Sequence, residues 1–452
     1  MLNKKSNSPL TGNRESAFKE APKAKRKAFS WLKFLRASTI AIAIAAFTLF
    51  LLVMPSNAQS YDSALKGRSD MSPSDPGPEN KPLVDANPNT FLPPPTDHGD
   101  VPSFWNSFSV AHRRIQEGGW ARQVNVDDFP ISKEIAGVNM KLNAGAIREL
   151  HWHQADEWAL MLTGNCRLTA IDLEGHSYVQ DVTAGDLWYF PSGIPHSLQG
   201  LGPDGAEFML VFNDGKFSED NTTLISDWVK HTPREVVAKN WGVPESAIIK
   251  PLSTIPEEGK YIFPAPVPPS LEQDRRAAAG GKSPSQVAFD FKMHTMTPTK
   301  TTPYGSVRVV DSSNFQVAKN IAAAYVVIKP GGMRELHWHP NSDEWQYYVQ
   351  GKARMTLFMN NSKAHTADFN ANDVGYVPRT FPHYIENTGN TDLIFIEMFK
   401  ASRFQDVSLN DWMTHIPPEL VLQHLNISKE TLDTIPKARL EIVPESLVQQ
   451  SR

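Results

Sequence analysis

Short hydrophobic segments, separated by polar positions and turn residues, dominate two blocks of the chain, residues 105–250 and 288–440. Residues 325–328 (Tyr-Val-Val-Ile) are one such segment, and Gly, Asn, Asp and Pro interrupt the series at short intervals. Segments of this length and composition are typical of β-strands, whose side chains alternate between two faces. The pattern therefore predicts an all-β fold, a sandwich or a barrel. Helical patterns gather late in each block, around 222–239 and 408–424, so we expect a few peripheral helices.

The segments between and around these blocks have a different composition. Residues 59–104 and 251–287 are rich in Pro and polar residues and carry no periodic pattern. Such composition favours extended, weakly structured chain. We therefore predict a Pro-rich arm at 59–104, a linker at 251–287 and a C-terminal tail at 441–452.

The first 58 residues are a candidate targeting segment. Residues 1–36 carry ten Lys and Arg against two Asp and Glu, and an uncharged apolar run follows at 37–54. A small-x-small sequence then ends at Ala58, which completes the order typical of a cleaved export signal. The apolar run is also long enough to span a membrane, so a retained anchor is the alternative. We expect an exported protein, periplasmic or secreted, with or without this anchor.

Charge and cysteine content exclude several classes of function. The chain beyond residue 58 holds 35 basic and 47 acidic residues, a balance that disfavours non-specific binding to nucleic acid. Cys166 is the single cysteine of the sequence. One cysteine excludes an intramolecular disulfide framework, a cysteine-based zinc cluster and an iron–sulfur centre.

The two blocks repeat one sequence unit. The six residues at 148–153 (Arg-Glu-Leu-His-Trp-His) recur unchanged at 334–339, an offset of 186 residues. Gly119 and Gly305 also match at this offset, and one inserted residue before Glu344 changes the offset to 187 farther along. The sequence therefore predicts two tandem homologous β-domains, at 105–250 and 288–440.

Each repeat carries three histidines and one glutamate with the spacing of metal ligands. Side chains at i and i+2 of a strand share a face, so both histidines of a His-x-His motif can point into one cavity. The glutamate follows four or five residues later, and a third histidine lies about 45 residues on. The candidate ligands are His151, His153, Glu157 and His196 in the first repeat, and His337, His339, Glu344 and His383 in the second. Nitrogen and oxygen ligands without thiolate suit Mn(II) or Fe(II), and less well Cu(II) or Ni(II), and argue against structural zinc.

These motifs resemble the cupin superfamily. Residues 145–164 are similar to the first cupin motif and residues 185–196 to the second, which in the other repeat departs from the pattern at Asn372 and Thr380. The words at 130–140 and 146–153 resemble the bicupin oxalate decarboxylases specifically. The resemblance implies two double-stranded β-helix (jelly-roll) barrels, two Mn(2+) per chain, O2 as redox cofactor and a homo-oligomer, trimer or hexamer.

The resemblance also implies an activity and further site residues. It implies conversion of oxalate to formate and carbon dioxide, with Arg148 and Arg334 holding the substrate. Their odd separation from the first histidine points them to the opposite face of a regular strand, so a bulge or turn must redirect them. The acid of the family matches Glu219, in a lid at residues 217–222 where Asp220 is a second acid, and the corresponding acid of the second repeat matches Glu397.

Two other functions fit the same metal ligands. An oxalate oxidase releases both carbons as carbon dioxide and makes hydrogen peroxide, and a lid without a carboxylate would favour it. An exported manganese-binding bicupin, a metal store with little catalysis, belongs to another class. Production of formate from oxalate by manganese-loaded protein distinguishes the three.

Overall fold

The computed structural model describes residues 80–444. The predicted export signal or anchor (1–58), the beginning of the arm (59–79) and the end of the tail (445–452) lie outside the described residues. Of the helices within 80–444, none combines the length and the apolar character needed to cross a membrane.

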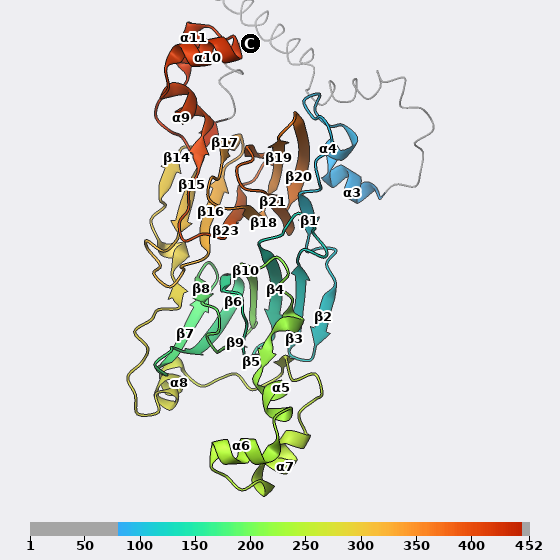
Figure 1. Cartoon of the computed structure of the whole chain (residues 1–452), viewed down its shortest axis with the longest axis vertical. Helices are drawn as coiled ribbons and strands as arrows, with labels where there is room; N and C mark the ends of the chain where they lie inside the picture. Colours follow the sequence, from blue (N-terminus) through green and yellow to red (C-terminus); the bar gives the residue numbers. More distant parts are fainter. Residues whose placement is uncertain (1–79, 445–452) are drawn as a thin grey trace, which may run out of the picture. The chain divides into compact units, whose positions relative to one another are not determined.

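Two barrels of antiparallel strands make up most of the described chain (Figure 1). The first barrel contains β2 (Arg113–Gln116), β3 (Gly119–Val124), β4 (Ala136–Leu142), β5 (Ile147–Trp152), β6 (Glu157–Ile171), β7 (Ser177–Thr183), β8 (Leu187–Phe190), β9 (His196–Gly200), β10 (Ala206–Phe212), β11 (Thr223–Leu224) and β12 (Ile262–Phe263). The second contains β14 (Lys300–Thr302), β15 (Gly305–Val310), β16 (Ala322–Ile328), β17 (Gly332–Trp338), β18 (Glu344–Gln350), β19 (Lys352–Met359), β20 (Lys363–Asn370), β21 (Asp373–Val377), β22 (His383–Asn387), β23 (Leu393–Phe399), β24 (Val407–Ser408) and β25 (Ile442–Pro444). The prediction of an all-β fold with two tandem barrels is confirmed.

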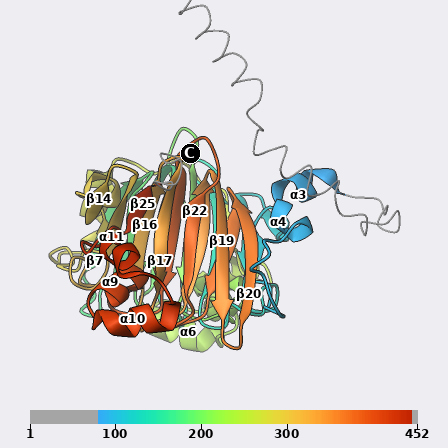
Figure 2. The same cartoon turned by 90° about the horizontal axis from the view of Figure 1, so that it is seen from above.

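The two repeats build their sheets from corresponding strands. In the first barrel the order β11-β5-β9-β6-β10-β4-β3-β2 runs through one sheet, because the long β6 belongs to both faces of the barrel. In the second barrel β18 and β19 together take the place of β6, and the strands divide into two sheets. One of them has the order β20-β19-β22-β17, which Figure 2 shows side by side.

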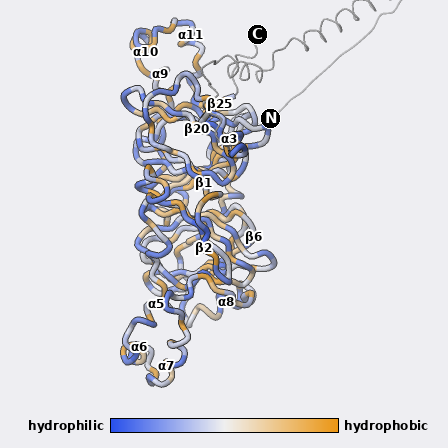
Figure 3. Tube along the Cα trace, turned by 90° about the vertical axis from the view of Figure 1, so that its right-hand side faces the viewer, coloured by the Kyte–Doolittle hydropathy of each residue, from blue (hydrophilic) through white to orange (hydrophobic). Residues whose placement is uncertain are grey.

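Each barrel encloses its own hydrophobic core, and a third core joins them. Hydrophobic residues recur along the strands of both barrels next to hydrophilic ones (Figure 3), so one face of each strand turns inward. The joining core packs Trp158 and Tyr189 of the first barrel with Trp345 and Tyr376 of the second, all fully buried. Burial of these aromatic side chains stabilises the contact between the two barrels.

Each barrel also receives a strand from outside its own repeat. β1 (Trp105–Ser107) opens the first repeat but pairs antiparallel with β21 of the second barrel. β13 (Asp290–Phe291) lies at the beginning of the second repeat but pairs with β8 of the first barrel. The first residues of the two sequence blocks therefore belong to the opposite barrels, an exchange that the repeat boundaries do not reveal.

Short helices lie outside the barrels. They are α3 (Lys81–Ala86), α4 (Pro88–Phe91), α5 (Ile225–Lys230), α6 (Arg234–Trp241), α7 (Ser246–Ser253), α8 (Leu271–Ala278), α9 (Leu409–Thr414), α10 (Pro418–Leu425) and α11 (Lys429–Thr434). Two of them, α3 and α4, fall in the predicted arm, where Asn89 donates two hydrogen bonds to Asp368 of the second barrel. The predicted linker holds α8 and β12, and the latter pairs with β5. Arm and linker thus contain more structure than their composition indicates, because contacts with the barrels supply the order that local sequence lacks.

Candidate metal centres

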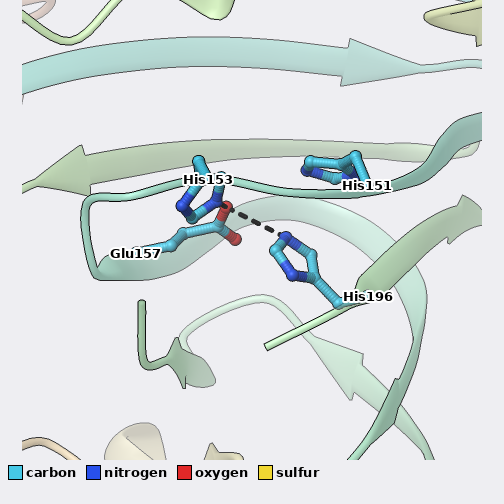
Figure 4. Close-up of side chains that lie close together, drawn as sticks. All are labelled: His151, His153, Glu157 and His196. Atoms are coloured by element: carbon cyan, nitrogen blue, oxygen red, sulfur yellow. Dashed lines mark hydrogen bonds and ion pairs between the residues drawn. The ribbon is translucent and has the colours of Figure 1, made fainter. Parts of the chain in front are cut away.

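The four candidate ligands of the first repeat converge inside the first barrel. His151 is the penultimate residue of β5, His153 follows the strand, Glu157 opens β6 and His196 opens β9. One ligand atom from each lies within 4.8 Å of the others, and all four side chains are buried. In Figure 4 His153 and His196 point toward the carboxylate of Glu157. Their Nε2 atoms lie 3.1 and 3.4 Å from its Oε2.

The second barrel repeats the arrangement. His337, His339, Glu344 and His383 also place their ligand atoms within 4.8 Å of one another, and all four are buried. The remaining carboxylate oxygen is held differently at the two centres. Trp188 donates its indole hydrogen to Oε1 of Glu157 (2.7 Å), whereas Gln346 donates its amide to Oε1 of Glu344 (2.7 Å). In both cases Oε2 is left facing the histidines.

The histidines are prepared to bind a cation. All six donate Nδ1–H to a backbone carbonyl, which only accepts, so Nε2 carries the free lone pair. Among the described residues the buried Nε2 atoms of His196, His337, His339 and His383 have no hydrogen-bond partner. Unpartnered buried acceptors that face one another are costly unless a ligand satisfies them. Three imidazoles and a carboxylate therefore fit a divalent metal such as Mn(II) at each centre.

Burial favours the neutral form of at least one histidine at each centre. Desolvation lowers the pKa of His151 well below its usual value, and the positive charge of Arg148 lowers it further. The pKa of His337 is lowered in the same way by burial and by Arg334. A neutral imidazole is the form that binds a metal, so these surroundings favour the ligand state.

A β-bulge turns each candidate arginine toward its centre. Where β5 pairs with β9, Arg148 lies opposite Leu198 and His151 opposite His196, so three residues on one strand span two on the other. The same shift occurs between Arg334 and His337 where β17 pairs with β22. The extra residue reverses the facing expected from the odd spacing. Both guanidinium groups are consequently buried, with Arg148 2% and Arg334 0% exposed.

The lid of the first barrel, residues 217–222, closes over the arginine. Glu219 is buried, and its Oε2 accepts hydrogen bonds from Nη2 of Arg148 (2.8 Å) and from the hydroxyl of Tyr261 (2.5 Å). Its backbone N–H donates to Gln123 (3.1 Å), and Ser218 caps the short 3-10 turn Glu219–Asn221. Nη1 of Arg148 has no partner among the described residues. One donor of a buried cation therefore remains available beside the metal ligands.

A cavity of about 400 Å³ is lined by Glu219 and Asp220 of the lid, together with Arg114 and Tyr261. Asp220, the other acid of the lid, is exposed there and pairs with Arg114 (2.6 Å). The guanidinium groups of Arg114 and Arg148 lie 4.2 and 4.1 Å from the ring centroid of Tyr261. Both acids of the lid thus line this cavity, but Glu219 is buried against Arg148, whereas Asp220 is exposed and pairs with Arg114.

The second centre contains a different acid arrangement. Asp406, at the 187-residue offset from Glu219, is hydrogen-bonded to Arg334, and Arg439 donates a second bond to it (2.6 Å). Burial alone would raise the pKa of Asp406, but the two arginines lower it to about 2. Glu397 lies on β23, where neither carboxylate oxygen has a hydrogen-bond partner in the described chain. Burial and the neighbouring Glu344 raise the pKa of Glu397 to about 8.

Sequence reasoning missed two residues of these sites, Tyr261 and Asp406. Tyr261 falls in the predicted linker, where no local motif marks it. Asp406 contacts Arg334 as Glu219 contacts Arg148, and Oε1 of the predicted acid Glu397 lies 3.7 Å from Nε of the same Arg334. The 187-residue offset already pairs positions 219 and 406, so the repeat itself carried that signal.

Comparisons with known proteins agree with this geometry. The family model "Cupin" matches residues 106–248 and 291–433, more than half of the chain. The oxalate decarboxylase OxdC of Bacillus subtilis (strain 168) is 48% identical over 357 residues, which cover 79% of this chain and 91% of that protein. A probable oxalate decarboxylase of Arthroderma benhamiae is 40% identical over 354 residues, or 77% and 85% of the two chains. A solved structure of the B. subtilis enzyme, from work on its Mn(II) centres, superposes with a TM-score of 0.77 at 46% identity and covers 82% of this chain and 96% of that one.

Proposed function

The chain belongs to the bicupin oxalate decarboxylases of the cupin family, and from this premise we propose which of its centres turns over and by which residues. The reaction is the conversion of oxalate to formate and carbon dioxide with manganese. We assign it to the first centre, with Arg148 as the substrate-binding cation, Glu219 as the acid and O2 as redox cofactor. The contact between Arg148 and Glu219 beside the metal ligands is the observation that carries the assignment.

The residues of the first centre can divide the chemistry among them. Manganese held by the four ligands supplies a Lewis acid and redox chemistry. Arg148 binds the free carboxylate of oxalate through its unpartnered Nη1, for which a planar guanidinium is well suited. Cleavage of the carbon–carbon bond releases carbon dioxide and leaves a one-carbon fragment whose carbon must gain a proton. One oxalate dianion and one proton then give one formate and one carbon dioxide.

Glu219 is placed to manage that proton. It is buried next to Arg148, and the hydroxyl of Tyr261 holds its carboxylate in position. Closure of the lid keeps bulk water from the fragment, so the proton comes from the carboxyl group rather than from solvent. The presence of Glu219 in the lid also disfavours the oxidase alternative, in which no acid protonates the fragment.

The second centre is less suited to this step. Asp406 occupies the place of Glu219 but is held by two arginines, and with its pKa of about 2 it stays ionised at neutral pH. It is also joined directly to β24, whereas three residues separate Glu219 from β11. Because no residue separates Asp406 from β24, its carboxylate cannot move aside for substrate. The second centre therefore binds metal in this proposal and contributes little to turnover.

Assembly and location complete the proposal. A trimer or hexamer is expected from family resemblance, and export through residues 1–58, with cleavage or with a retained anchor at 37–54, is expected from the sequence. Neither expectation affects the assignment of the first centre.

The test is an assay of the purified, manganese-loaded chain with oxalate. We expect formate and carbon dioxide in equal amounts and two manganese ions per chain by elemental analysis. Peroxide without formate would establish an oxidase, and bound manganese without either product would establish a metal store. Copper or zinc at both centres of the native protein would count against the decarboxylase, although these metals bind such ligands more tightly than manganese does.

A further inference from the structure

A buried carboxylate lies immediately before the glutamate ligand of the first centre. Asp156 is 3% exposed, and its Oδ1 accepts a hydrogen bond from the backbone N–H of Ser192 (2.6 Å). Its Oδ2 accepts from the side-chain amides of Asn213 (2.8 Å) and Asn320 (2.7 Å). Its own N–H donates to Oδ1 of Asn213 (2.9 Å), so Asp156 and Asn213 are bonded in both directions.

The partners of Asp156 come from three parts of the site. Ser192 lies in the turn that precedes His196, and Asn213 directly follows β10, where the segment leading to the lid begins. Asn320 belongs to the second barrel, just before β16. One side chain thus connects the turn that carries Glu157, the turn of the third histidine and Asn213, which we call the root of the lid.

We propose that Asp156 is a positioning residue that holds the root of the lid against the first metal centre. It acts through Asn213 to keep Glu219 over Arg148, and in this it rests on the proposed function. A carboxylate suits the position because Ser192, Asn213 and Asn320 all present donors. Hydrogen bonds to a buried charged group are worth more than neutral ones, so the junction is rigid.

The second repeat has a different set of hydrogen bonds at the position that corresponds to Asp156. Its Asp343 accepts from the N–H of Arg379 (2.8 Å) and from the hydroxyl of Tyr376 (2.5 Å). The counterpart of Asn213 is Lys400, which pairs with Glu134 (2.7 Å) instead of with Asp343. Within residues 80–444 a pair of hydrogen bonds thus joins the aspartate to the residue after the last long strand in the first barrel, which has the lid. In the second barrel Lys400 pairs with Glu134 instead.

Asp156→Asn tests the role with little change of shape. An amide at this position turns its NH2 group toward a donor in either orientation, so at least one bond is lost. Asp343→Asn is the matched control, because the Tyr376 hydroxyl can accept as well as donate. In the full manganese-loaded chain we expect amide hydrogen exchange at residues 214–223 to become about tenfold faster in Asp156→Asn and to stay unchanged in Asp343→Asn. A tenfold change corresponds to about 1.4 kcal/mol, the lower end for a charge-assisted hydrogen bond.

Product analysis supplies a second readout. The ratio of formate to peroxide should fall about tenfold in Asp156→Asn, while manganese content stays at two per chain, because only the acid is displaced. Asn213→Ala should act in the same direction and serves if Asp156→Asn does not fold. Unchanged lid exchange in both variants, or an equal change in Asp343→Asn, overturns the proposal. If the unaltered protein makes no formate but its lid exchange responds as expected, the proposed function fails and the positioning role of Asp156 stands.

Discussion

Glu219 and Glu397 are both buried carboxylates, but their partners differ. Glu219 is bonded to Arg148 and Tyr261, whereas neither oxygen of Glu397 has a hydrogen-bond partner among the described residues. We expect Glu219→Gln to lower formate production by about 10²–10⁴-fold, the usual contribution of a general acid, because the amide keeps the shape and cannot give a proton. Manganese content should not change, since the lid provides no ligand.

Formate and peroxide are measured together in this experiment, with Glu397→Gln as the companion variant. Some peroxide is expected from Glu219→Gln, because the fragment loses electrons to O2 when no proton arrives. Full formate output from Glu219→Gln and none from Glu397→Gln would move the principal catalytic site to the second barrel.

Glu397 makes a prediction about stability in the metal-free protein. Its pKa is raised to about 8 in the folded state, above the ordinary value of 4.5 that applies when the chain unfolds. Between these two pH values the folded protein binds the proton more tightly, so the free energy of unfolding decreases as pH rises from about 4.5 to 8. Glu397→Gln removes this dependence. As the pH rises toward 8, the denaturant concentration at the unfolding midpoint should therefore fall less for Glu397→Gln than for the unaltered protein. Midpoints that change with pH in parallel would contradict the raised pKa of Glu397.

Thr380 shows how a departure from a motif can be tolerated. The sequence places it where the first repeat has Gly193, and the structure gives both residues a left-handed backbone, with φ of 72° and 76°. Nothing lies within 4 Å of a Cβ built at Gly193, so a side chain fits the turn and only the backbone is strained. The turn and the position of His383 thus follow the motif, although Thr rather than the expected Gly adopts the left-handed backbone.

At the scale of elements, the strands and ligands followed from the sequence, but the facing of the arginines did not. The alternation of side chains along a regular strand predicts that Arg148 faces away from His151. This prediction fails because a bulge adds one residue between them. A bulge is fixed by pairing with another strand, here β9, which is distant in the sequence. Local pattern therefore could not locate it, and the same holds for Arg334.

The lid and its counterpart differ by length, which the repeat comparison could have shown. Leu224 pairs with His151 and Ser408 pairs with His337, so these positions correspond. Between the acid and this pairing the first barrel has three more residues than the second. The added residues, 220–222, are what makes the first segment a lid.

Asp220 supplies the prediction at this scale. Its pair with Arg114 is solvent-exposed, with side chains 77% and 34% accessible, and such pairs contribute less than about 1 kcal/mol. Asp220→Asn should consequently lower formate production by no more than about fivefold in dilute buffer, and the difference should disappear near 1 M salt, where screening extends to about 3 Å. Steady-state kinetics at two salt concentrations measure this. A loss as large as that of Glu219→Gln would identify Asp220 as the acid.

At the scale of the whole molecule, the exchanged strands join the two repeats more closely than a linker does. β1 completes a sheet of the second barrel, β13 extends the first, and a shared core lies between them. The repeat identified the two barrels, whereas the exchange depends on pairing between residues far apart in the chain. Sequence boundaries at 105 and 288 consequently do not separate two independent bodies.

A chain cut between Gly281 and Lys282, both exposed, tests this union. Each fragment then carries a strand that belongs to the other barrel, so we expect co-expressed fragments to elute together in size-exclusion chromatography and each alone to aggregate. Removing residues 80–107, which include β1, should weaken the association. Two fragments that fold and remain separate would show that the barrels are independent.

The exchange of strands also sets an order of events during synthesis. Trp105 of β1 and its partner Asp373 are 268 residues apart, which corresponds to about 13–54 seconds of translation at 5–20 residues per second. The first barrel can close once β13 leaves the ribosome, while β1 still waits with an unpaired edge for β21. The ligands of the first centre are therefore all present well before His383 has been made. A nascent chain can therefore bind metal at the first centre while part of the second barrel is still to be translated.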